Sequence, residues 1–127
     1  MSDKKDPVFE IRFFERIVER TPNYIEALIP LAEAYTRTGN FQKGLEIDRR
    51  LSRLCNKDPV VFYNLACSLA LVGEKKEAVK ALAMAVKLGY ADFRHLMRDK
   101  DLVSLHEDPE FQSLLKTGKP KRQSRKE

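Results

Sequence analysis

The sequence predicts an all-α protein, and three observations carry this prediction. A period of 34 residues relates residues 28–51 to residues 62–85 without an insertion or deletion. Apolar residues recur at spacings of three and four along most of the chain, which places them on one face of a helix. The composition, with 34% charged residues, 43% apolar residues, five Gly and no Trp, suits a helical domain better than a β-sandwich. A chain of 127 residues is long enough for one such domain around a single core.

The repeat combines large residues, small residues and a glycine in a fixed order. The pairs that coincide after the shift of 34 positions are Leu28 and Phe62, Leu31 and Leu65, Ala32 and Ala66, Tyr35 and Leu69, Gly39 and Gly73, Gly44 and Ala78, and Leu51 and Ala85. This order resembles the tetratricopeptide repeat, a helix-turn-helix unit that stacks into a solenoid. The resemblance covers about residues 8–115 and implies an all-α, right-handed α-solenoid that binds other molecules.

Asp-Pro pairs mark the starts of three predicted helices. An Asp side chain accepts hydrogen bonds from free amide groups, and Pro needs no donor at the first helical position. The first pair begins a helix over residues 7–22. On the repeat, this helix corresponds to the second helix of a preceding unit, so the chain starts with a half repeat. The three pairs are Asp6-Pro7, Asp58-Pro59 and Asp108-Pro109.

The first full repeat consists of two predicted helices. Asn23 and Glu26 have the spacing of a capping box, which predicts a helix from there to about Arg37. The partner helix is expected over residues 41–55. In that helix, Asp48 stands where the family usually has a large aromatic residue, which predicts weaker packing.

The second full repeat contains the most apolar helix, residues 59–72. Its apolar residues surround the helix, so we expect it to be buried on most sides, in the middle of the stack. Gly73 ends this helix and Gly89 ends its partner, residues 74–88, since glycine tolerates the left-handed conformation common at helix C-termini.

The stretch after Tyr90 is expected to close the C-terminal end of the stack. It predicts short helices at about 91–98, 101–105 and 109–115, and it resembles the closing segment of many bacterial tetratricopeptide proteins. A solenoid end exposes an apolar face that needs such a cap. Both chain termini lack apolar anchors and are expected to be disordered. The expected segments are the N-terminus 1–6, the half repeat 7–22, the full repeats 23–58 and 59–90, the closing helices 91–115, and the basic tail 116–127.

The resemblance implies that the first helix of each repeat lines a concave groove, which binds a peptide or helix of a partner protein. The expected groove residues are Glu26, Ile29, Glu33, Thr36, Arg37, Tyr63, Asn64, Cys67, Leu71, Arg94 and Arg98. Glu26, Glu33 and Arg37 would give an open groove mixed charge. It would then favour an extended segment with an apolar anchor and flanking charges of both signs.

Each of these residues also has a structural interpretation. The side chains that lie on the apolar helix can be core residues covered by a neighbouring helix: Tyr63, Cys67 and Leu71. The arginines Arg94 and Arg98 can pair with nearby aspartates.

Some members of the family bind the C-terminal carboxylate of heat-shock chaperones through a clamp of Lys, Asn, Asn, Lys and Arg. Asn64, Arg94 and Arg98 match three of these five positions, whereas Ile29 and Glu33 do not. A carboxylate at position 33 would repel the ligand's own charge, so the sequence disfavours the clamp.

The basic tail is the alternative binding element. Residues 116–127 hold six basic and one acidic side chain, which accounts for the net charge of +5. Such a segment can bind nucleic acid or another polyanion through salt-sensitive contacts, although it has no aromatic residue for base stacking. The residues that would make these contacts are Lys119, Lys121, Arg122, Arg125 and Lys126. A third hypothesis is weak self-association through Phe9 and Phe13 of the first helix, and otherwise a monomer is expected.

The remaining patterns argue against catalysis. His95 and His106 have no nucleophile or H-E-x-x-H motif beside them, and the chain has no Gly-rich phosphate loop. Cys55 and Cys67 lack metal-ligand spacing and are expected to be packing residues in a reducing compartment. We therefore expect a protein that is not an enzyme and uses no cofactor or metal. The absence of a signal sequence and of a long apolar run predicts a cytoplasmic location without membrane contact.

Overall fold

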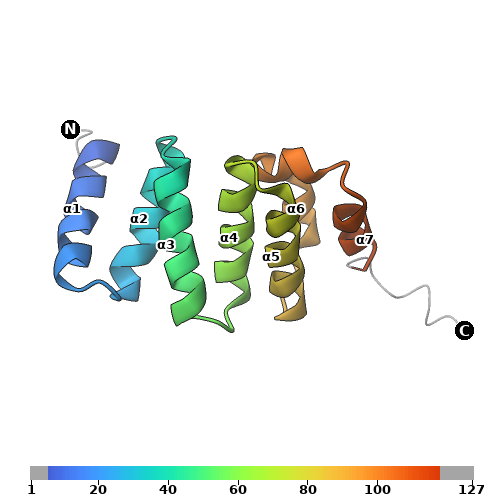
Figure 1. The fold of residues 1–127 in the computed structure, drawn as a ribbon, viewed down its shortest axis with the longest axis horizontal. Coiled ribbons are helices and arrows are strands. Elements are labelled where there is room, and N and C mark those ends of the chain that lie inside the picture. Colours follow the sequence, from blue (N-terminus) through green and yellow to red (C-terminus); the bar gives the residue numbers. More distant parts are fainter. Residues whose placement is uncertain (1–5, 118–127) are drawn as a thin grey trace, which may run out of the picture.

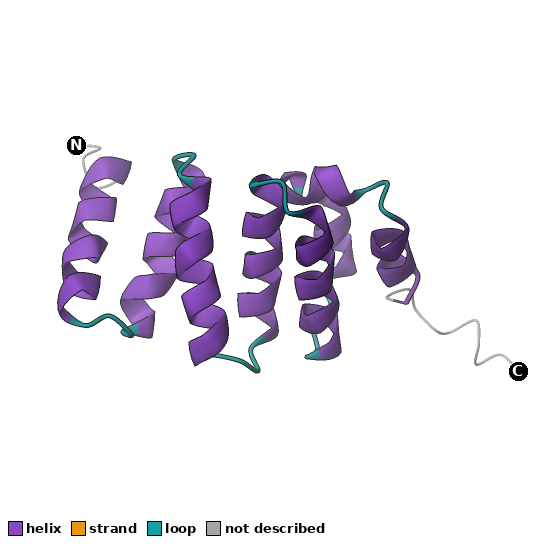
Figure 2. Cartoon of the chain, in the orientation of Figure 1, coloured by secondary structure: helices purple, strands orange, loops and turns teal. Residues whose placement is uncertain are grey.

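The computed structural model describes residues 6–117, and in this range the chain folds into helices joined by short turns, without a strand (Figures 1 and 2). The all-α prediction is thus confirmed, and the helices agree with the predicted ones to within about two residues at most ends. The elements are α1 (Pro7–Arg20), α2 (Ile25–Arg37), α3 (Phe41–Leu54), α4 (Pro59–Leu71), α5 (Lys75–Lys87), α6 (Phe93–Arg98), the 3-10 helix η2 (Lys100–Leu105) and α7 (Pro109–Thr117).

The helices lie side by side, largely in chain order, along the long axis of the molecule (Figure 1). From α1 to α5, each helix contacts the next one. The chain then folds back, because η2 packs against both α4 and α5, and α7 packs against α5. Helices α1 and α7 therefore stand at opposite ends of the described structure, with α4 between them.

The Asp-Pro pairs cap helices as predicted. In each case the Asp carboxylate accepts a hydrogen bond from a backbone amide in the first turn, and the amides belong to Val8, Val60 and Glu110. The capping box predicted at Asn23 is wrong. The residue that precedes α2 is Tyr24, and its side chain makes no capping hydrogen bond.

Two groups of buried residues form the core. One joins α1, α2 and α3 and includes Leu28 and Leu31. The other joins α4 and α5 to the closing helices, and its fully buried members from those helices are Leu96, Leu102, Leu105 and Phe111. Most residues of α4 are buried, which confirms its predicted place in the middle. The closing helices thus complete the second core rather than lying loosely on it.

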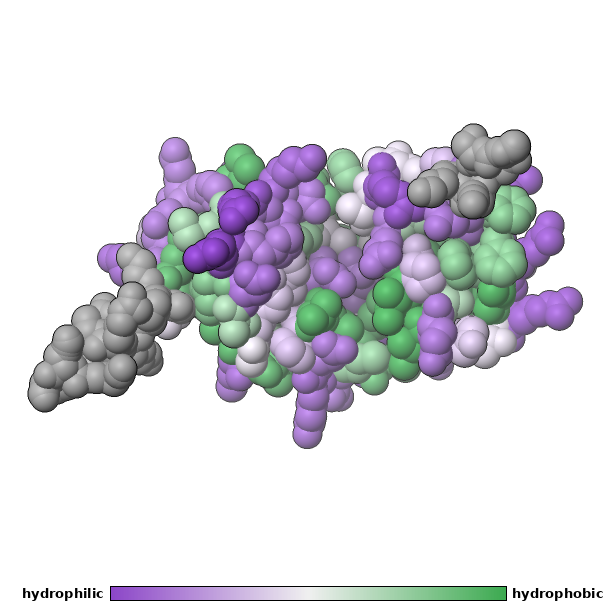
Figure 3. Space-filling model, turned by 180° about the vertical axis from the view of Figure 1, so that it is seen from behind, coloured by the Kyte–Doolittle hydropathy of each residue, from purple (hydrophilic) through white to green (hydrophobic). Residues whose placement is uncertain are grey.

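The α1 end is open by comparison. No residue of α1 is buried, and Phe9 and Phe13 are 61% and 50% exposed. Their rings stack on each other with centroids 6.3 Å apart. Apolar surface is visible at this end of the molecule (Figure 3). Among the described residues, no helix is both long and apolar enough to cross a membrane.

Candidate binding groove

A groove crosses the middle of the protein, with a cavity volume of about 670 Å³. Side chains of α2, α3 and α4 line one part, and residues at the junction of α6 and η2 line the other. The larger apolar side chains in the lining are Ile29, Leu51, Val60 and Val61. Ile29 and Val60 are 39% and 53% exposed, so apolar surface is accessible along the groove.

The structure brings most of the predicted groove residues together. The predicted residues that line the groove are Ile29, Glu33, Thr36, Arg37, Tyr63, Asn64 and Cys67. Glu26, Leu71, Arg94 and Arg98 lie outside this lining. Since Arg94 and Arg98 do not join Asn64 in the groove, the five-residue carboxylate clamp does not assemble here. The tail residues Lys119, Lys121, Arg122, Arg125 and Lys126 lie outside the described part of the chain.

Tyr63 and Cys67 line the groove from buried positions, at 5% and 8% exposure. The Tyr63 ring stacks on Tyr90, with centroids 4.5 Å apart and planes 10° apart. Its hydroxyl donates a hydrogen bond of 2.5 Å to Asp99 Oδ2. The structural interpretation therefore holds for these two residues, although part of each reaches the groove. The residues that cover Tyr63 and Cys67 belong to the segment after α5. The repeat pattern fades in that segment, so the sequence did not predict where it packs.

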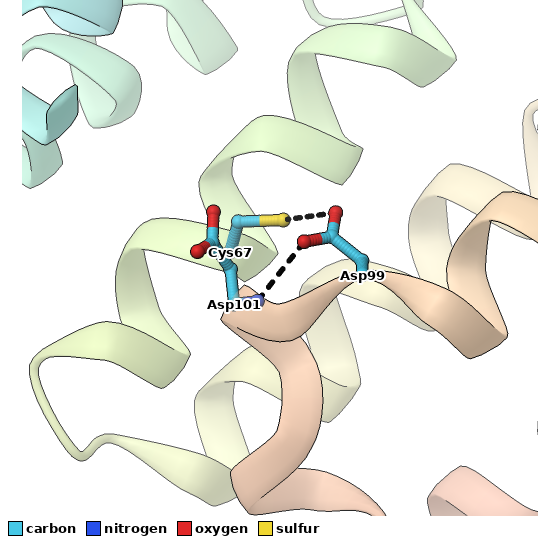
Figure 4. Close-up of side chains that lie close together, drawn as sticks. All are labelled: Cys67, Asp99 and Asp101. Atoms are coloured by element: carbon cyan, nitrogen blue, oxygen red, sulfur yellow. Dashed lines mark hydrogen bonds between the residues drawn. The ribbon is translucent and has the colours of Figure 1, made fainter.

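Asp99 connects α4 to the closing helices. Its Oδ2 also accepts from the Cys67 thiol at 3.7 Å, and its Oδ1 accepts from the Asp101 backbone amide at 3.0 Å (Figure 4). Burial raises the pKa of the Cys67 thiol, and the nearby Asp99 and Asp101 carboxylates add to this rise. The thiol is therefore a protonated donor at neutral pH, not a reactive thiolate. His95 Nε2 lies 3.4 Å from Asp99 Oδ2 on the exposed side of the cluster.

Cys67, Asp99 and Asp101 are also close enough to share a metal ion, since one potential ligand atom of each lies within 4.8 Å of the others (Figure 4). Sequence reasoning missed this grouping because Cys67 and Asp99 are far apart in the chain. The hydrogen bonds from Tyr63 and Cys67 already occupy Asp99 Oδ2. These hydrogen bonds account for the position of the Asp99 side chain next to Cys67 without an ion.

Asp48 of α3 is a buried carboxylate that lines the groove, at 5% exposure. Its Oδ2 accepts a hydrogen bond of 2.5 Å from the hydroxyl of Ser68, which is 3% exposed. Burial raises the pKa of Asp48 to about 6; the hydrogen bond from Ser68 opposes this rise, and the Glu33 carboxylate adds to it. In the sequence, Asp48 is noticeable only because it replaces the large aromatic residue that is usual at this position of the repeat. That difference does not indicate that Asp48 lines a groove.

The charged residues give the groove an acidic character. Its acidic side chains are Glu33, Asp48, Asp58, Asp99 and Asp101, whereas its basic ones are Arg37 and Lys100. Arg37 is also engaged outside, because it forms an ion pair with Glu10 of α1 at 2.5 Å. The lining therefore carries charges of both signs, as expected from Glu33 and Arg37, but the expectation did not include its excess of acidic side chains. That expectation considered only the residues of the first helices and missed the aspartates that α3 and the closing helices contribute.

Fold and site together describe an all-α protein with an acidic groove across neighbouring helices. No protein-family model matches the chain. The chain is similar to a chloroplastic protein of Arabidopsis thaliana, with 30% identity over 88 residues, which cover 65% of this chain and 25% of that protein. This chain thus spans about a quarter of the length of the relative.

Proposed function

We propose that this chain is a tetratricopeptide-like α-solenoid, with two full repeats between an N-terminal half repeat and a C-terminal closing segment. The helix order and the 34-residue period support this proposal. Gly39 and Gly73, one period apart, follow α2 and α4 and adopt similar positive φ angles of 86° and 91°. Equivalent positions of the two units therefore have equivalent backbone conformations.

We further propose that the protein binds a segment of another protein in the groove and catalyses no reaction. The observation that carries this proposal is the groove itself, which combines exposed apolar side chains with charged ones across several helices. Exposed apolar surface with polar surroundings is typical of sites where proteins bind one another. The basic tail stays a second hypothesis from the sequence.

The structure changes which substitutions test the proposal. Tyr63→Ala is unsuitable, because Tyr63 is buried against Tyr90 and Asp99 and its loss would disturb folding. Val60 is a better position, because it lines the groove and is 53% exposed. Val103 of η2 is 57% exposed and does not line the groove, so it serves as the matched control.

The experiment replaces Val60 or Val103 by a photo-cross-linking amino acid in the full chain, expressed in cells of the source organism. We expect illumination to yield a discrete protein adduct from position 60 and none from position 103. Adding Ile29→Asp, which places a charge on the groove surface, is expected to remove the adduct. Identical adducts from both positions, or adducts that persist with Ile29→Asp, would contradict binding in the groove.

A further inference from the structure

The groove contains a largely buried carboxylate, Asp48, with one oxygen bonded inside the protein and the other open to the groove. Asp48 is 5% exposed, and Ser68 donates to its Oδ2. The other oxygen, Oδ1, receives no hydrogen bond from residues 6–117 and is not enclosed by them, so it is accessible from the groove. A buried charge without a positive partner is costly, and an added cation relieves this cost.

A second acidic group lies on another wall of the same groove. Asp99 and Asp101 enter it from the start of η2. The Asp101 side chain receives no hydrogen bond from the described residues, whereas Asp99 receives those of Tyr63 and Cys67. Burial and then the Asp99 carboxylate raise the pKa of Asp101, and the neighbouring Lys100 opposes this rise. Lys100, the residue between Asp99 and Asp101 in the sequence, also lines the groove.

We propose that the groove is specific for a basic segment of a partner protein, with an Arg or Lys side chain against Asp48, a second basic side chain near Asp101, and an apolar side chain against Ile29 and Val60. This inference rests on the proposed function and narrows it to one chemistry. Charge complementarity selects the basic residues, because an acidic segment would face several carboxylates at once. The exposed apolar side chains select a neighbouring apolar residue.

The chain's own basic tail and a nucleic acid fit this groove less well. Residues 118–127 read Gly-Lys-Pro-Lys-Arg-Gln-Ser-Arg-Lys-Glu and offer no large apolar side chain for Ile29 and Val60. A nucleic acid brings phosphates, which the acidic lining repels. A segment of another protein supplies both the basic and the apolar side chains.

The test selects phage-displayed random peptides of about twelve residues on the immobilised full chain. It then measures the binding of the best peptide, labelled with fluorescein, by fluorescence anisotropy. We expect enriched peptides to combine Arg or Lys with a neighbouring apolar residue. The double variant Asp48→Asn and Asp101→Asn should bind this peptide at least about tenfold more weakly, since it removes two partners of buried charges. The side-chain amide introduced at position 48 would still accept the hydrogen bond from Ser68, and circular dichroism checks that the helices are intact.

The matched control is the double variant Glu19→Gln and Glu46→Gln, which changes the net charge equally at exposed positions outside the groove. We expect its affinity to stay within about twofold of the original. If both double variants lost the same affinity for the peptide, the loss would reflect net charge alone, and the inference would be overturned.

Three other outcomes overturn the inference in distinguishable ways. The selection could yield peptides without basic residues whose binding is lost with Ile29→Asp. That result would refute the specificity for basic segments but would still support binding in the groove. A selection without any peptide sensitive to Ile29→Asp would refute both. Displacement of the labelled peptide by a synthetic peptide of residues 118–127, with equal or higher affinity, would assign the groove to the chain's own tail instead of a partner.

Discussion

The Asp48 carboxylate of α3 accepts a hydrogen bond of 2.5 Å from the Ser68 hydroxyl of α4, and both side chains are almost fully buried. This contact links the second helix of one proposed repeat to the first helix of the next. It also places a carboxylate in the lining of the groove. One polar pair thus contributes to the joint between the units and to the charge of the candidate site.

The first prediction concerns the pH dependence of stability. The pKa of Asp48 is about 6 in the folded protein, compared with 3.8 for an Asp side chain that is not buried, as in the unfolded chain. The folded state therefore binds the proton of Asp48 more tightly than the unfolded state does. Ionisation therefore destabilises the fold as the pH rises from about 4 to about 6, by roughly 3 kcal/mol in total. Asp48→Asn should thus become more stable than the original over this range, and the difference should stay constant at higher pH.

Urea unfolding followed by circular dichroism at several pH values measures this difference. Glu46→Gln is the control, because Glu46 lies on the same helix and is exposed, and it should show a difference below about 0.5 kcal/mol at every pH. A stability difference for Asp48→Asn that does not change between about pH 4 and pH 7 would show that Asp48 does not titrate in this way.

Sequence reasoning reached the helices because their signals are local. The aspartates before α1, α4 and α7 cap the helices directly, and a glycine follows α2, α4 and α5 with positive φ. The start of α2 escaped prediction because Tyr24 precedes it without a side-chain cap. A capping box needs the residue to lie at the helix end, which spacing alone does not guarantee.

The candidate groove was only half predictable. Residues of α2 and α4 were found because the repeat assigns them a common face. The acidic character was missed because Asp99 and Asp101 belong to the segment where the period fades, and only tertiary packing brings that segment against α4. For the same reason, the sequence could not decide that Tyr90 covers Tyr63.

The second prediction addresses the hydrogen bond between Tyr63 and Asp99. Tyr63→Phe keeps the ring that stacks on Tyr90 and removes only the hydroxyl group. Asp99 then loses a donor in a half-buried position, which we expect to lower the free energy of unfolding by about 1–3 kcal/mol. Chemical denaturation measures this loss. Tyr24→Phe is the control, because Tyr24 is 44% exposed and its hydroxyl should contribute nothing measurable; equal effects of the two changes would refute the role of Asp99.

The third prediction tests whether the closing helices belong to the core. Phe111 of α7 is fully buried in the same cluster as Leu82 of α5. Phe111→Ala should lower the free energy of unfolding by about 3–5 kcal/mol, because it removes a large buried side chain and leaves a cavity. Val103→Ala, at a position that is 57% exposed, should cost less than about 0.5 kcal/mol. A small effect of Phe111→Ala in thermal or chemical denaturation would mean that α7 does not stabilise the rest.

The fourth prediction tests whether the two proposed repeats are equivalent at their turns. Gly39 and Gly73 have φ angles of 86° and 91°, and a Cβ added at either one would meet no atom within 4 Å. Substitution by Ala therefore costs backbone strain alone, which we expect to be about 1–2 kcal/mol at each position. Asn tolerates this conformation better, so Gly39→Asn and Gly73→Asn should each cost less than the corresponding Ala variant. Denaturation of the four variants decides the matter: costs that differ widely between the two sites, or Asn variants as unstable as the Ala ones, would show that the shared glycines do not reflect a shared turn.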